Sequence, residues 1–429
     1  MNSSDRPSVA VIGAGITGIT TAYCLAKRGC LVTVFDRHPY AAMETSFANG
    51  GQLSASNAEV WNSWANVAKG LKWILTPGAP LLIGPAPSWH KMSWIAEFLA
   101  AISKYEENTI ATARLAVSAR QFLKDIAAAE AIDFDCHEQG ILHFYRTKSE
   151  FDSAGRVSQL LARGGVDRRA VTPSEMHSIE PALKGEFYGG YYTSADFTGD
   201  IHKFANGLAA ACTKLGVILY FATVVKTIEA SPSGIAIASC HSASSLDQRD
   251  ALMAVDRFDK VVICAGTTSR SIGAKLGDRL NIYPIKGYSI TVQLPAKADQ
   301  EAAPWTGLLD DAAKVVTSRL GATRFRIAGT AELNGENGDI RAARIAPLVA
   351  WCGSNFPKIS TRQAIPWAGL RPMMPDMLPR VACGRDPRVF YNTGHGHLGW
   401  TLSAATADAV AALVTSRTIA AQRSIGWRR

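Results

Sequence analysis

The sequence predicts an α/β protein in which a discontinuous nucleotide-binding domain is interrupted by insertions that form a mixed sheet with helices. Three observations lead to this prediction. A strand, a glycine turn, a helix and a second strand follow one another within residues 8–37. Short apolar runs typical of buried parallel strands recur far along the chain, as in 258–266. The stretches 61–198 and 276–361 combine helical and alternating patterns.

The elements are expected in the following order. The first strand spans 8–12, its helix ends at Gly29, and the second strand spans 31–36. Helical periodicity with almost no breakers covers 93–129. Further strands or extended segments are predicted at 138–146, 217–230, 258–266, 283–294 and 324–330, and further helices at 200–216 and 400–415. Asp200 is the predicted N-cap of the helix at 200–216.

The composition is that of an ordinary globular protein. The chain has 429 residues, of which 47% are apolar and 19% charged, so it can bury a large core. The formal net charge is +9, but the basic residues are scattered rather than gathered in a patch. We therefore predict no binding to nucleic acid. The charge also suits an acidic cofactor or substrate, or an anionic membrane surface.

The eight cysteines indicate a reducing compartment. No two have CxxC spacing, and several lie in apolar runs such as VVICAG (261–266). This pattern predicts buried free thiols rather than disulfides or a zinc site. The first residues lack the features of a signal peptide, and no apolar stretch is long enough to predict a membrane-spanning helix. We expect a cytoplasmic protein, and association with the inner face of the cell membrane is left open.

The stretch GAGITG (13–18) is the most specific motif for ligand binding. It has the spacing GxGxxG, follows a predicted strand and opens a predicted helix, and Asp36 ends the next strand 18 residues after Gly18. Gly13 allows the tight turn, Gly15 leaves room for a pyrophosphate, and Gly18 lets helix and strand pack closely. The helix N-terminus then faces the phosphates, and Asp36 can bind a ribose. The sequence therefore predicts a Rossmann-like dinucleotide site.

The segment METSFANGGQLS (43–54) favours a flavin over a nicotinamide cofactor. It follows the acidic residue closely and is rich in glycine and small polar side chains. A flavin domain uses such a loop to bring backbone and hydroxyl groups toward the pyrophosphate and the isoalloxazine ring. A nicotinamide domain needs none there.

Nine stretches, taken together, resemble a known family. They are GAGITG, Asp36-Arg37, ETSFANGGQLS (44–54), GILHFYR (140–146), IEPAL (179–183), FTGD (197–200), YPIKGYSITV (283–292), WAGLRPMMPD (367–376) and NTGHGHLGWTLS (392–403). In this order they resemble the small subunit of bacterial D-amino-acid dehydrogenase, within the D-amino-acid oxidase/glycine oxidase group of flavoproteins. The resemblance covers nearly the whole chain.

The resemblance implies a cofactor, a reaction and a fold. It implies FAD, a glycine oxidase-like fold, and oxidative deamination of D-amino acids to 2-oxo acids and ammonia. Electrons would pass to a quinone or another respiratory-chain acceptor. One region departs from the family. Where members often carry a proline-rich PWAxPG-like stretch, this chain reads SASNAEVWNSWANVAKGLKWIL (54–75). A cyclic D-imino acid such as D-proline is therefore an alternative substrate.

The motifs and the resemblance together mark a set of residues for contact with FAD. These are Gly13, Gly15, Ile16, Thr17, Gly18, Asp36, Arg37, Thr45, Ser46, Asn49, Gly51, Gln52, Leu53, Val225, Ala265, Gly266, Gly394, His395, Gly396, Leu398, Gly399, Trp400 and Thr401. Val225 resembles the position whose backbone meets adenine. For Gly266, a plain strand-to-turn glycine is the alternative.

Substrate binding requires a carboxylate anchor, for which a bidentate arginine is best suited. Arg371 lies between a leucine and a proline in a segment that, by resemblance, borders the flavin. Arg319 resembles an anchor of related oxidases, with Arg324 as the alternative. Tyr288 is a second anchor candidate or an ordinary strand tyrosine. Lys286 could approach flavin N5 through a water molecule or form a salt bridge.

The stretch NTGHGHLGWTLS allows three interpretations, namely a metal clip, a catalytic histidine pair, or a backbone cradle. We predict the cradle, because no histidine or carboxylate motif elsewhere supplies partner ligands, so no metal is expected. Hydride transfer also needs no protein nucleophile. The glycines would let the backbone approach the flavin, and the helix N-terminus would stabilise negative charge on it.

The predicted FAD-binding domain comprises 1–60, 199–275 and 362–429, and the predicted substrate-binding domain 61–198 and 276–361. Two other functions are left open. One is an oxidase that uses oxygen, and the other is a non-catalytic flavoprotein subunit of an electron-transfer complex.

Overall fold

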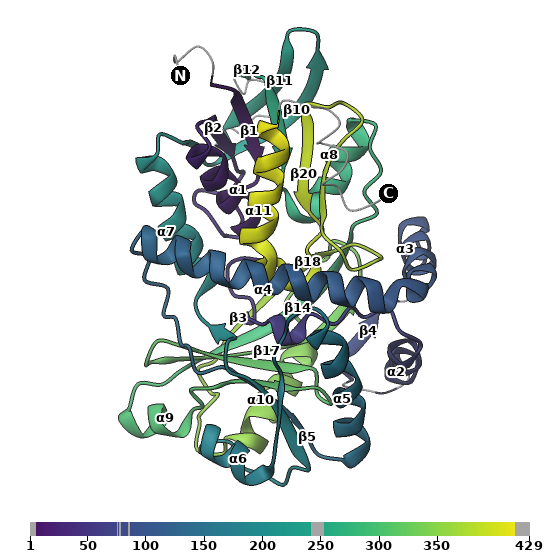
Figure 1. Cartoon of the computed structure of the whole chain (residues 1–429), viewed down its shortest axis with the longest axis vertical. Coiled ribbons are helices and arrows are strands. Elements are labelled where there is room, and N and C mark those ends of the chain that lie inside the picture. Colours follow the sequence, from purple (N-terminus) through teal and green to yellow (C-terminus); the bar gives the residue numbers. More distant parts are fainter. Residues whose placement is uncertain (1–5, 75, 77–78, 85, 242–252, 417–429) are drawn as a thin grey trace.

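The computed structural model describes residues 6–74, 76, 79–84, 86–241 and 253–416. Two large sheets occupy opposite halves of the molecule, and the long helix α4 (Tyr105–Ala129) runs across the region where they meet (Figure 1). The α/β fold class expected from the sequence is confirmed. The ends of the predicted FAD-binding domain, 1–5 and 417–429, and its segment 242–252 lie outside the described residues.

The first sheet has six strands in the order β19-β20-β13-β1-β2-β9. They are β1 (Ser8–Ile12), β2 (Leu31–Phe35), β9 (Ile218–Tyr220), β13 (Lys260–Ile263), β19 (Arg380–Cys383) and β20 (Val389–Thr393). All pairs are parallel except β19 with β20. Parallel strands align their carboxyl ends at one edge, which is where such sheets bind ligands.

The second sheet has nine strands and is mixed. Eight of its strands follow the order β18-β14-β17-β16-β15-β5-β7-β6, and the ninth, β4 (Leu81–Ile83), pairs with β17. In that order, the eight are β18 (Ile365–Met373), β14 (Tyr283–Gln293), β17 (Arg324–Leu333), β16 (Val315–Leu320), β15 (Gly307–Asp310), β5 (Ile141–Tyr145), β7 (Gly189–Thr193) and β6 (Arg169–Val171). Because β18 falls within 362–429, this segment of the predicted FAD-binding domain is hydrogen-bonded to the sheet of the other part. The domain division itself stays a prediction.

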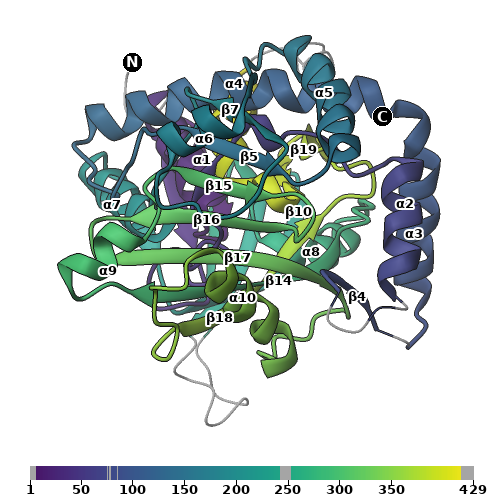
Figure 2. The ribbon, with the colours of Figure 1, turned by 90° about the horizontal axis from the view of Figure 1, so that it is seen from below.

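Smaller sheets and helices complete the molecule. Two short strands, β3 (Gln52–Leu53) and β8 (Phe197–Thr198), pair with each other, and β10 (Thr223–Ser231), β11 (Gly234–His241) and β12 (Ala254–Phe258) form an antiparallel sheet. The other helices are α1 (Ile16–Lys27), α2 (Trp64–Ile74), α3 (Trp89–Ala100), α5 (Lys148–Ala162), α6 (Pro173–Ile179), α7 (Ile201–Lys214), α8 (Ser269–Lys275), α9 (Lys297–Ala302), α10 (Ala342–Asn355) and α11 (Gly399–Thr415). Figure 2 shows α2 and α3 side by side at one end of the nine-stranded sheet.

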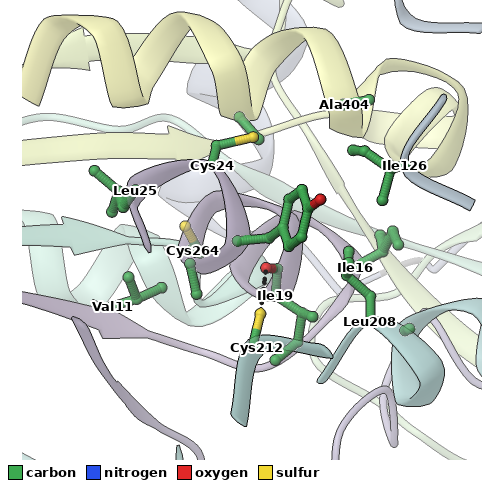
Figure 3. Close-up of a cluster of buried hydrophobic side chains, with 14 of the residues drawn as sticks. Val11, Ile16, Ile19, Cys24, Leu25, Ile126, Leu208, Cys212, Cys264 and Ala404 are labelled. Atoms are coloured by element: carbon green, nitrogen blue, oxygen red, sulfur yellow. Dashed lines mark hydrogen bonds between the residues drawn. The ribbon is translucent and has the colours of Figure 1, made fainter. Parts of the chain in front are cut away.

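The core of the six-stranded half forms around α1. Helices α7 and α11 pack on α1, and apolar side chains from β1, α4 and α7 fill the space between them (Figure 3). The thiols of Cys24, Cys212 and Cys264 belong to this core, and Cys212 Sγ donates to the carbonyl of Ile19 at 3.7 Å. All eight cysteines are free and six are buried, which agrees with the prediction of reduced thiols.

The structure refines several expected elements. The helical stretch 93–129 is divided by a 3₁₀ turn, Ala101–Lys104, into the end of α3 and the whole of α4. The extended segment 217–230 is divided between β9 and β10, where Ala222 has a positive φ of 48°. Neither break is marked by glycine or proline. Among the described residues, one segment, Gly396–Thr415, is long and apolar enough to cross a membrane, and it is largely buried as the core helix α11.

Candidate functional site

A cavity of about 770 Å³ lies between the carboxyl edge of the six-stranded sheet and the nine-stranded sheet. Its walls include the glycine turn before α1, the segment 44–52, strands β14 and β18, and the loop that precedes α11. Most of the residues expected to contact FAD line this cavity. Gly18, Leu53 and Gly394 do not line it.

The glycine turn has the geometry expected for a pyrophosphate site. Gly13 has φ +104°, a conformation that favours glycine, and its N–H donates to the carbonyl of Phe35 at 2.8 Å. A Cβ built on Gly15 would meet only the Ser46 hydroxyl, at 3.5 Å, so the backbone there faces open space. A Cβ on Gly18 would lie 1.9 Å from the Gly13 carbonyl oxygen. Gly18 therefore serves close packing of strand and helix, and Gly15 leaves room for a ligand.

Asp36 holds the end of β2 against the glycine turn. One carboxylate oxygen accepts from the Ala14 N–H at 2.6 Å, and the other accepts from the His38 N–H at 2.8 Å. Arg37 next to it pairs with Glu44, which also contacts His38. Val225 on β10 lies at the same end of the cavity, together with Ala265 and Gly266 after β13. This end suits the adenosine half of a dinucleotide.

The segment 44–52 connects the two sheets by hydrogen bonds. Ser46 Oγ accepts from the Ile16 N–H at 3.1 Å, which supplies a partner at the start of α1. Thr45 Oγ1 donates to the carbonyl of Leu370 on β18 at 2.8 Å. Gln52 Nε2 donates to carbonyls on β15 and β16 at 3.0 and 2.9 Å. The expected flavin loop is therefore fixed at both of its ends.

The two histidines of the GHGHLG stretch do not converge on one point. His395 Nε2 is hydrogen-bonded to Thr406 Oγ1 at 2.9 Å, whereas the His397 ring stacks on Trp61 with ring centroids 4.7 Å apart. Burial lowers the pKa of His395 to about 3. Burial, together with the positive charge of Arg371, lowers the pKa of His397 to about 4. Both rings are therefore neutral at neutral pH. Within the part of the chain that is described, no group of His, Cys, Asp and Glu is placed to hold a metal ion.

The glycines of this stretch bring the backbone against β18. Gly394 and Gly396 have φ +76° and +59°, and a Cβ on Gly396 would lie 2.7 Å from Met373 Sδ. A 3₁₀ turn, Gly396–Leu398, leads directly into α11 at Gly399. Gly396, Leu398, Gly399, Trp400 and Thr401 all line the cavity. The start of α11 therefore faces the same space as the start of α1.

Arg371 presents an unpaired cation to the cavity. It lies on β18 opposite Ile285 of β14, and its guanidinium occupies space beside Gly287, where a built Cβ would lie 2.3 Å from Nη2. Desolvation by burial lowers its pKa to about 10, so it remains charged at neutral pH. Across the described residues, no carboxylate or carbonyl forms a hydrogen bond or ion pair with it. A half-buried cation without a partner is suited to bind an anion from outside the chain.

The structure does not bring Arg319 or Arg324 to the cavity, which corrects the sequence-based expectation. The Arg319 guanidinium is buried, donates to four backbone carbonyls including Gln300 and Ala322, and lies over the Trp305 ring. Arg324 pairs with Asp135 and Asp200. Both guanidinium groups are fully engaged, and neither residue lines the cavity. The resemblance left Arg319 and Arg324 as alternatives, and neither provides an anchor here.

Tyr288 and Lys286 belong to a buried network around Glu332. The Tyr288 hydroxyl donates to Glu332 Oε2 at 2.6 Å, and Lys286 Nζ contacts the same oxygen at 3.1 Å. Lys286 does not line the cavity, so the salt-bridge alternative describes it. Burial would raise the pKa of Glu332, but the bonds from Tyr288 and Lys286 hold it below its usual value. Tyr288 lines the cavity with its hydroxyl already engaged.

Several residues of the site were not expected from the sequence. Aromatic side chains of Trp61, Trp94, Phe98 and Trp367 line the cavity, and Trp94 stacks on Phe98 with ring centroids 5.3 Å apart. The i,i+4 spacing of Trp94 and Phe98 predicted a helix, but it did not show that this face of the helix lines a cavity. The charged residues Glu59, Asp311 and Lys314 also line it. The segment 54–75 departs from the family pattern, so no template existed for Glu59 or Trp61.

Asp196 and Asp200, which lie at the two ends of the stretch DFTGD, both hold backbone in place. Asp200 caps α7 as predicted, accepting from the His202 and Lys203 N–H groups at 2.9 and 3.2 Å. Asp196 is buried, accepts from the N–H groups of Ala55 and Ser56, and pairs with Arg120 at 2.9 Å. Asp196 thereby fixes the turn that leads to Glu59.

Comparison with known proteins defines the class. Residues 8–413 match the DAO family of FAD-dependent oxidoreductases, and the chain therefore belongs to that family. It is an FAD-dependent enzyme, as the glycine turn and the loop 44–52 predicted. Its fold is also that of solved flavoenzymes. A glycine oxidase from Bacillus cereus superposes with a TM-score of 0.73 at 19% identity and covers 99% of both chains. An L-proline dehydrogenase from P. horikoshii superposes with a TM-score of 0.72 at 17% identity, over 96% of this chain and 93% of that one.

Curated relatives are more similar to this chain in sequence than these solved structures are. D-amino acid dehydrogenase 3 of Mesorhizobium japonicum is 58% identical over 96% of this chain and 97% of its own length. A D-amino acid dehydrogenase of Paramagnetospirillum magneticum is 39% identical over 95% of each chain. The resemblance to the D-amino-acid dehydrogenase family that the motifs indicated is confirmed.

Proposed function

We propose that this protein is an FAD-dependent dehydrogenase of D-amino acids or cyclic D-imino acids. Its similarity to proteins named D-amino acid dehydrogenases supports this substrate class. The observation that carries the proposal is the unpaired Arg371 guanidinium in the cavity, because it matches the carboxylate that every amino-acid substrate presents.

The residues around the cavity fit FAD. The open space beside Gly15 accommodates the pyrophosphate, and Asp36 lies where it can bind a ribose. The N-termini of α1 and α11 both border the cavity and offer positive dipole ends to the phosphates and to the reduced ring. Backbone at Ala265, Gly266 and 396–401 completes the site.

The protein supplies orientation and electrostatics to the reaction. When bound, FAD supplies the acceptor for the hydride that leaves the substrate Cα. Arg371 binds the substrate carboxylate and fixes the Cα–H direction. The aromatic wall of Trp61, Trp94 and Trp367 excludes water and offers an apolar surface to the substrate side chain. This wall suits small apolar side chains and the ring of a D-imino acid such as D-proline.

An anaerobic reduction screen tests the proposed function. The purified holoenzyme is mixed without oxygen with D-alanine, D-proline and their L-isomers, and the flavin absorbance is followed. We expect bleaching by D-isomers and none by L-isomers, with a loss of about 10- to 100-fold in reduction efficiency for Arg371→Ala, the value of a charge-assisted carboxylate contact. A flavin that no D-amino or D-imino acid bleaches contradicts the proposal and favours a non-catalytic subunit.

We further propose that a respiratory quinone is the electron acceptor and that the protein contacts the inner face of the membrane. Exposed apolar side chains on α2 and α3 support this, namely Trp64, Leu71, Trp89 and Met92. The same two helices line the cavity with Val67, Trp94 and Phe98. Tryptophan on a surface helix is typical of contact with a membrane interface.

Turnover with a short-chain quinone should exceed turnover with air-saturated buffer, and the protein should sediment with anionic lipid vesicles. Trp64→Ser with Trp89→Ser should reduce sedimentation without changing reduction by D-alanine under anaerobic conditions, because both side chains are exposed and neither lines the cavity. Faster turnover with oxygen, with release of peroxide, would instead identify an oxidase. Sedimentation unchanged in the double variant would exclude α2 and α3 as the contact.

A further inference from the structure

Residues 48–50 of the segment 44–52 are held by β14, β17 and β16, which are neighbouring strands of the nine-stranded sheet (Figure 2). Their three backbone carbonyls each accept a hydrogen bond from a side chain of a different strand. These bonds run to Ala48 from Ser289 Oγ at 2.7 Å, to Asn49 from Arg326 Nη1 at 2.9 Å and to Gly50 from Ser318 Oγ at 2.6 Å. The sheet therefore fixes the direction of three consecutive peptide groups.

The register of the strands explains why these side chains reach the segment. Arg326 has Thr291 of β14 and Ser318 of β16 as its cross-strand partners, so the three residues form one row across the sheet. Ser289 lies two residues before Thr291, and alternate residues of a strand point to the same face. A Cβ built on Gly50 would lie 2.9 Å from a methyl group of β16, so the segment packs directly against that face.

Holding the carbonyls also sets the direction of the N–H groups in the same peptides. In a trans peptide the C=O and N–H bonds point in opposite directions. The N–H groups of Asn49 and Gly50 are therefore directed away from the side chains that hold the carbonyls. Among the described residues, neither N–H has an acceptor, and both residues line the cavity. Two adjacent backbone donors are thus available to a molecule that fills the cavity.

Arg326 places a positive charge behind this segment. Its side chain is buried, and Nε donates to Thr291 Oγ1 at 2.7 Å, whereas no carboxylate in the described part of the chain forms an ion pair with it. Burial lowers its pKa to about 10, with the charge of Asp200 acting against burial, so the guanidinium stays charged at neutral pH. Arg326 itself does not line the cavity, so it acts on a bound molecule through the peptide that it holds.

These donors belong to the side of the cavity that suits the flavin ring. They are held by the nine-stranded sheet, whereas Asp36, at the end that suits adenosine, follows β2 of the six-stranded sheet. Thr45 of the same segment donates to the carbonyl of Leu370, the residue before Arg371. The ring half of FAD therefore matches the two N–H groups better than the adenosine half.

We propose that Arg326 is a positioning residue for the flavin ring and raises its reduction potential. It holds the Asn49–Gly50 peptide so that the Gly50 N–H donates to the ring, and its charge strengthens this donor through the peptide. Two electrons and one proton enter the ring as hydride, which adds one negative charge to it. The Gly50 N–H therefore binds the reduced ring more tightly than the oxidised ring. The inference rests on FAD binding and not on the proposed substrate.

The midpoint potential of the bound flavin tests this role without an amino-acid substrate. The holoenzyme is reduced slowly under anaerobic conditions with dithionite and a reference dye, and the two absorbances are compared at equilibrium. Arg326→Gln keeps an amide donor but removes the charge. We expect the equilibrium constant for flavin reduction by the dye to fall about 10-fold, which is a potential about 30 mV lower for two electrons. Arg326→Lys keeps the charge and should retain most of the wild-type potential.

Cofactor affinity tests the positioning itself. FAD is added to the apoprotein, and the change in its fluorescence gives the Kd. Because a charge-assisted hydrogen bond is lost, Arg326→Gln should raise the Kd of FAD about 10-fold. The Kd of ADP should not change, because ADP lacks the ring. Ser289→Ala removes a neutral bond to the same segment, so it should raise the Kd of FAD by a smaller factor and leave the potential close to that of the wild type.

Arg319→Gln is the matched control. Arg319 is also buried and lies on the neighbouring strand β16, but it donates to four carbonyls outside the segment 44–52. Its replacement should lower Tm and leave the potential unchanged. Thr291→Val is the milder variant if Arg326→Gln does not fold. It removes the acceptor of Arg326 Nε and keeps the charge, so it should weaken binding of FAD more than binding of ADP.

Three results would overturn the inference. The first is an unchanged potential in Arg326→Gln with FAD bound, or a drop in Arg326→Lys as large as that in Arg326→Gln. The second is an equal drop in Arg319→Gln, which would show a general loosening of the sheet. The third is a raised KM for the amino acid with FAD affinity and potential both unchanged, which would assign the two N–H groups to the substrate. Only this last result uses an amino acid, so failure of the proposed function leaves the other measurements interpretable.

Discussion

The role of Arg371 depends on the residues that surround its guanidinium in the folded chain. A buried guanidinium normally needs several acceptors, and Arg319 in this same protein has four backbone carbonyls. Arg371 has none among the residues described, and the space for it exists because Gly287 on the adjacent strand has no side chain. The cation is therefore held by steric fit and is free to bind an anion. Its orientation therefore depends on Gly287, a residue of the neighbouring strand that has no side chain.

Replacing Gly287 with alanine tests this arrangement. The new Cβ would lie 2.3 Å from Nη2 of Arg371, so the flexible guanidinium must move while the strand keeps its register. We expect kcat/KM for the D-amino acid to fall by about 10- to 100-fold, since a misplaced charge-assisted bond loses about 1.5–3 kcal/mol. The change should fall mainly on KM, with the flavin spectrum unaltered. Steady-state kinetics over a substrate titration measures both.

Gly353→Ala is a suitable control for this variant, because a Cβ built there meets nothing within 4 Å. It should change neither KM nor kcat. If Gly287→Ala binds substrate as tightly as the wild type does, the guanidinium does not need the space beside Gly287, and the anchor has been placed wrongly.

Residues whose roles follow from local backbone were predictable, and residues whose roles depend on tertiary contacts were not. Gly13 and Gly15 are defined by the turn itself, and Asp36 by its distance from that turn. Arg319 and Arg371 both lie outside the strands predicted from the sequence, and their patterns do not say which guanidinium meets carbonyls and which meets a cavity.

Helices and strands also divide into those set by local sequence, which were predictable, and those set by tertiary contacts, which were not. The unit β1–α1–β2 is local, so its periodicity and its glycines predicted it almost to the residue. The N-cap of α7 was equally local, and Asp200 binds the first N–H groups as expected. The break between α3 and α4 was not predicted, because the turn at Ala101–Lys104 contains neither glycine nor proline. Strand β18 was not predicted from the sequence, and its pairing with β14 is non-local.

At the scale of the whole molecule, the cavity is where the two sheets meet. Five segments far apart in the sequence supply its walls, and the hydrogen bonds of Thr45 and Gln52 connect the flavin loop to the nine-stranded sheet. A ligand that fills the cavity therefore contacts both halves. Binding energy gained there is added to the free energy of unfolding of both halves, because the unfolded chain has no such site.

The last prediction concerns thermal stability as a function of cofactor. FAD at 100 times its dissociation constant should raise the free energy of unfolding by about 2.7 kcal/mol. For a chain of 429 residues this corresponds to a rise in Tm of about 3 °C over the apoprotein. Each further tenfold in FAD adds about 1.4 kcal/mol. ADP should shift Tm less than FAD at equal concentration, because it reaches only the end of the cavity near Asp36 and Val225. Equal shifts with ADP and FAD in a calorimetric titration would mean that the half of the cavity bordered by β14, β18 and the start of α11 contributes nothing to cofactor binding.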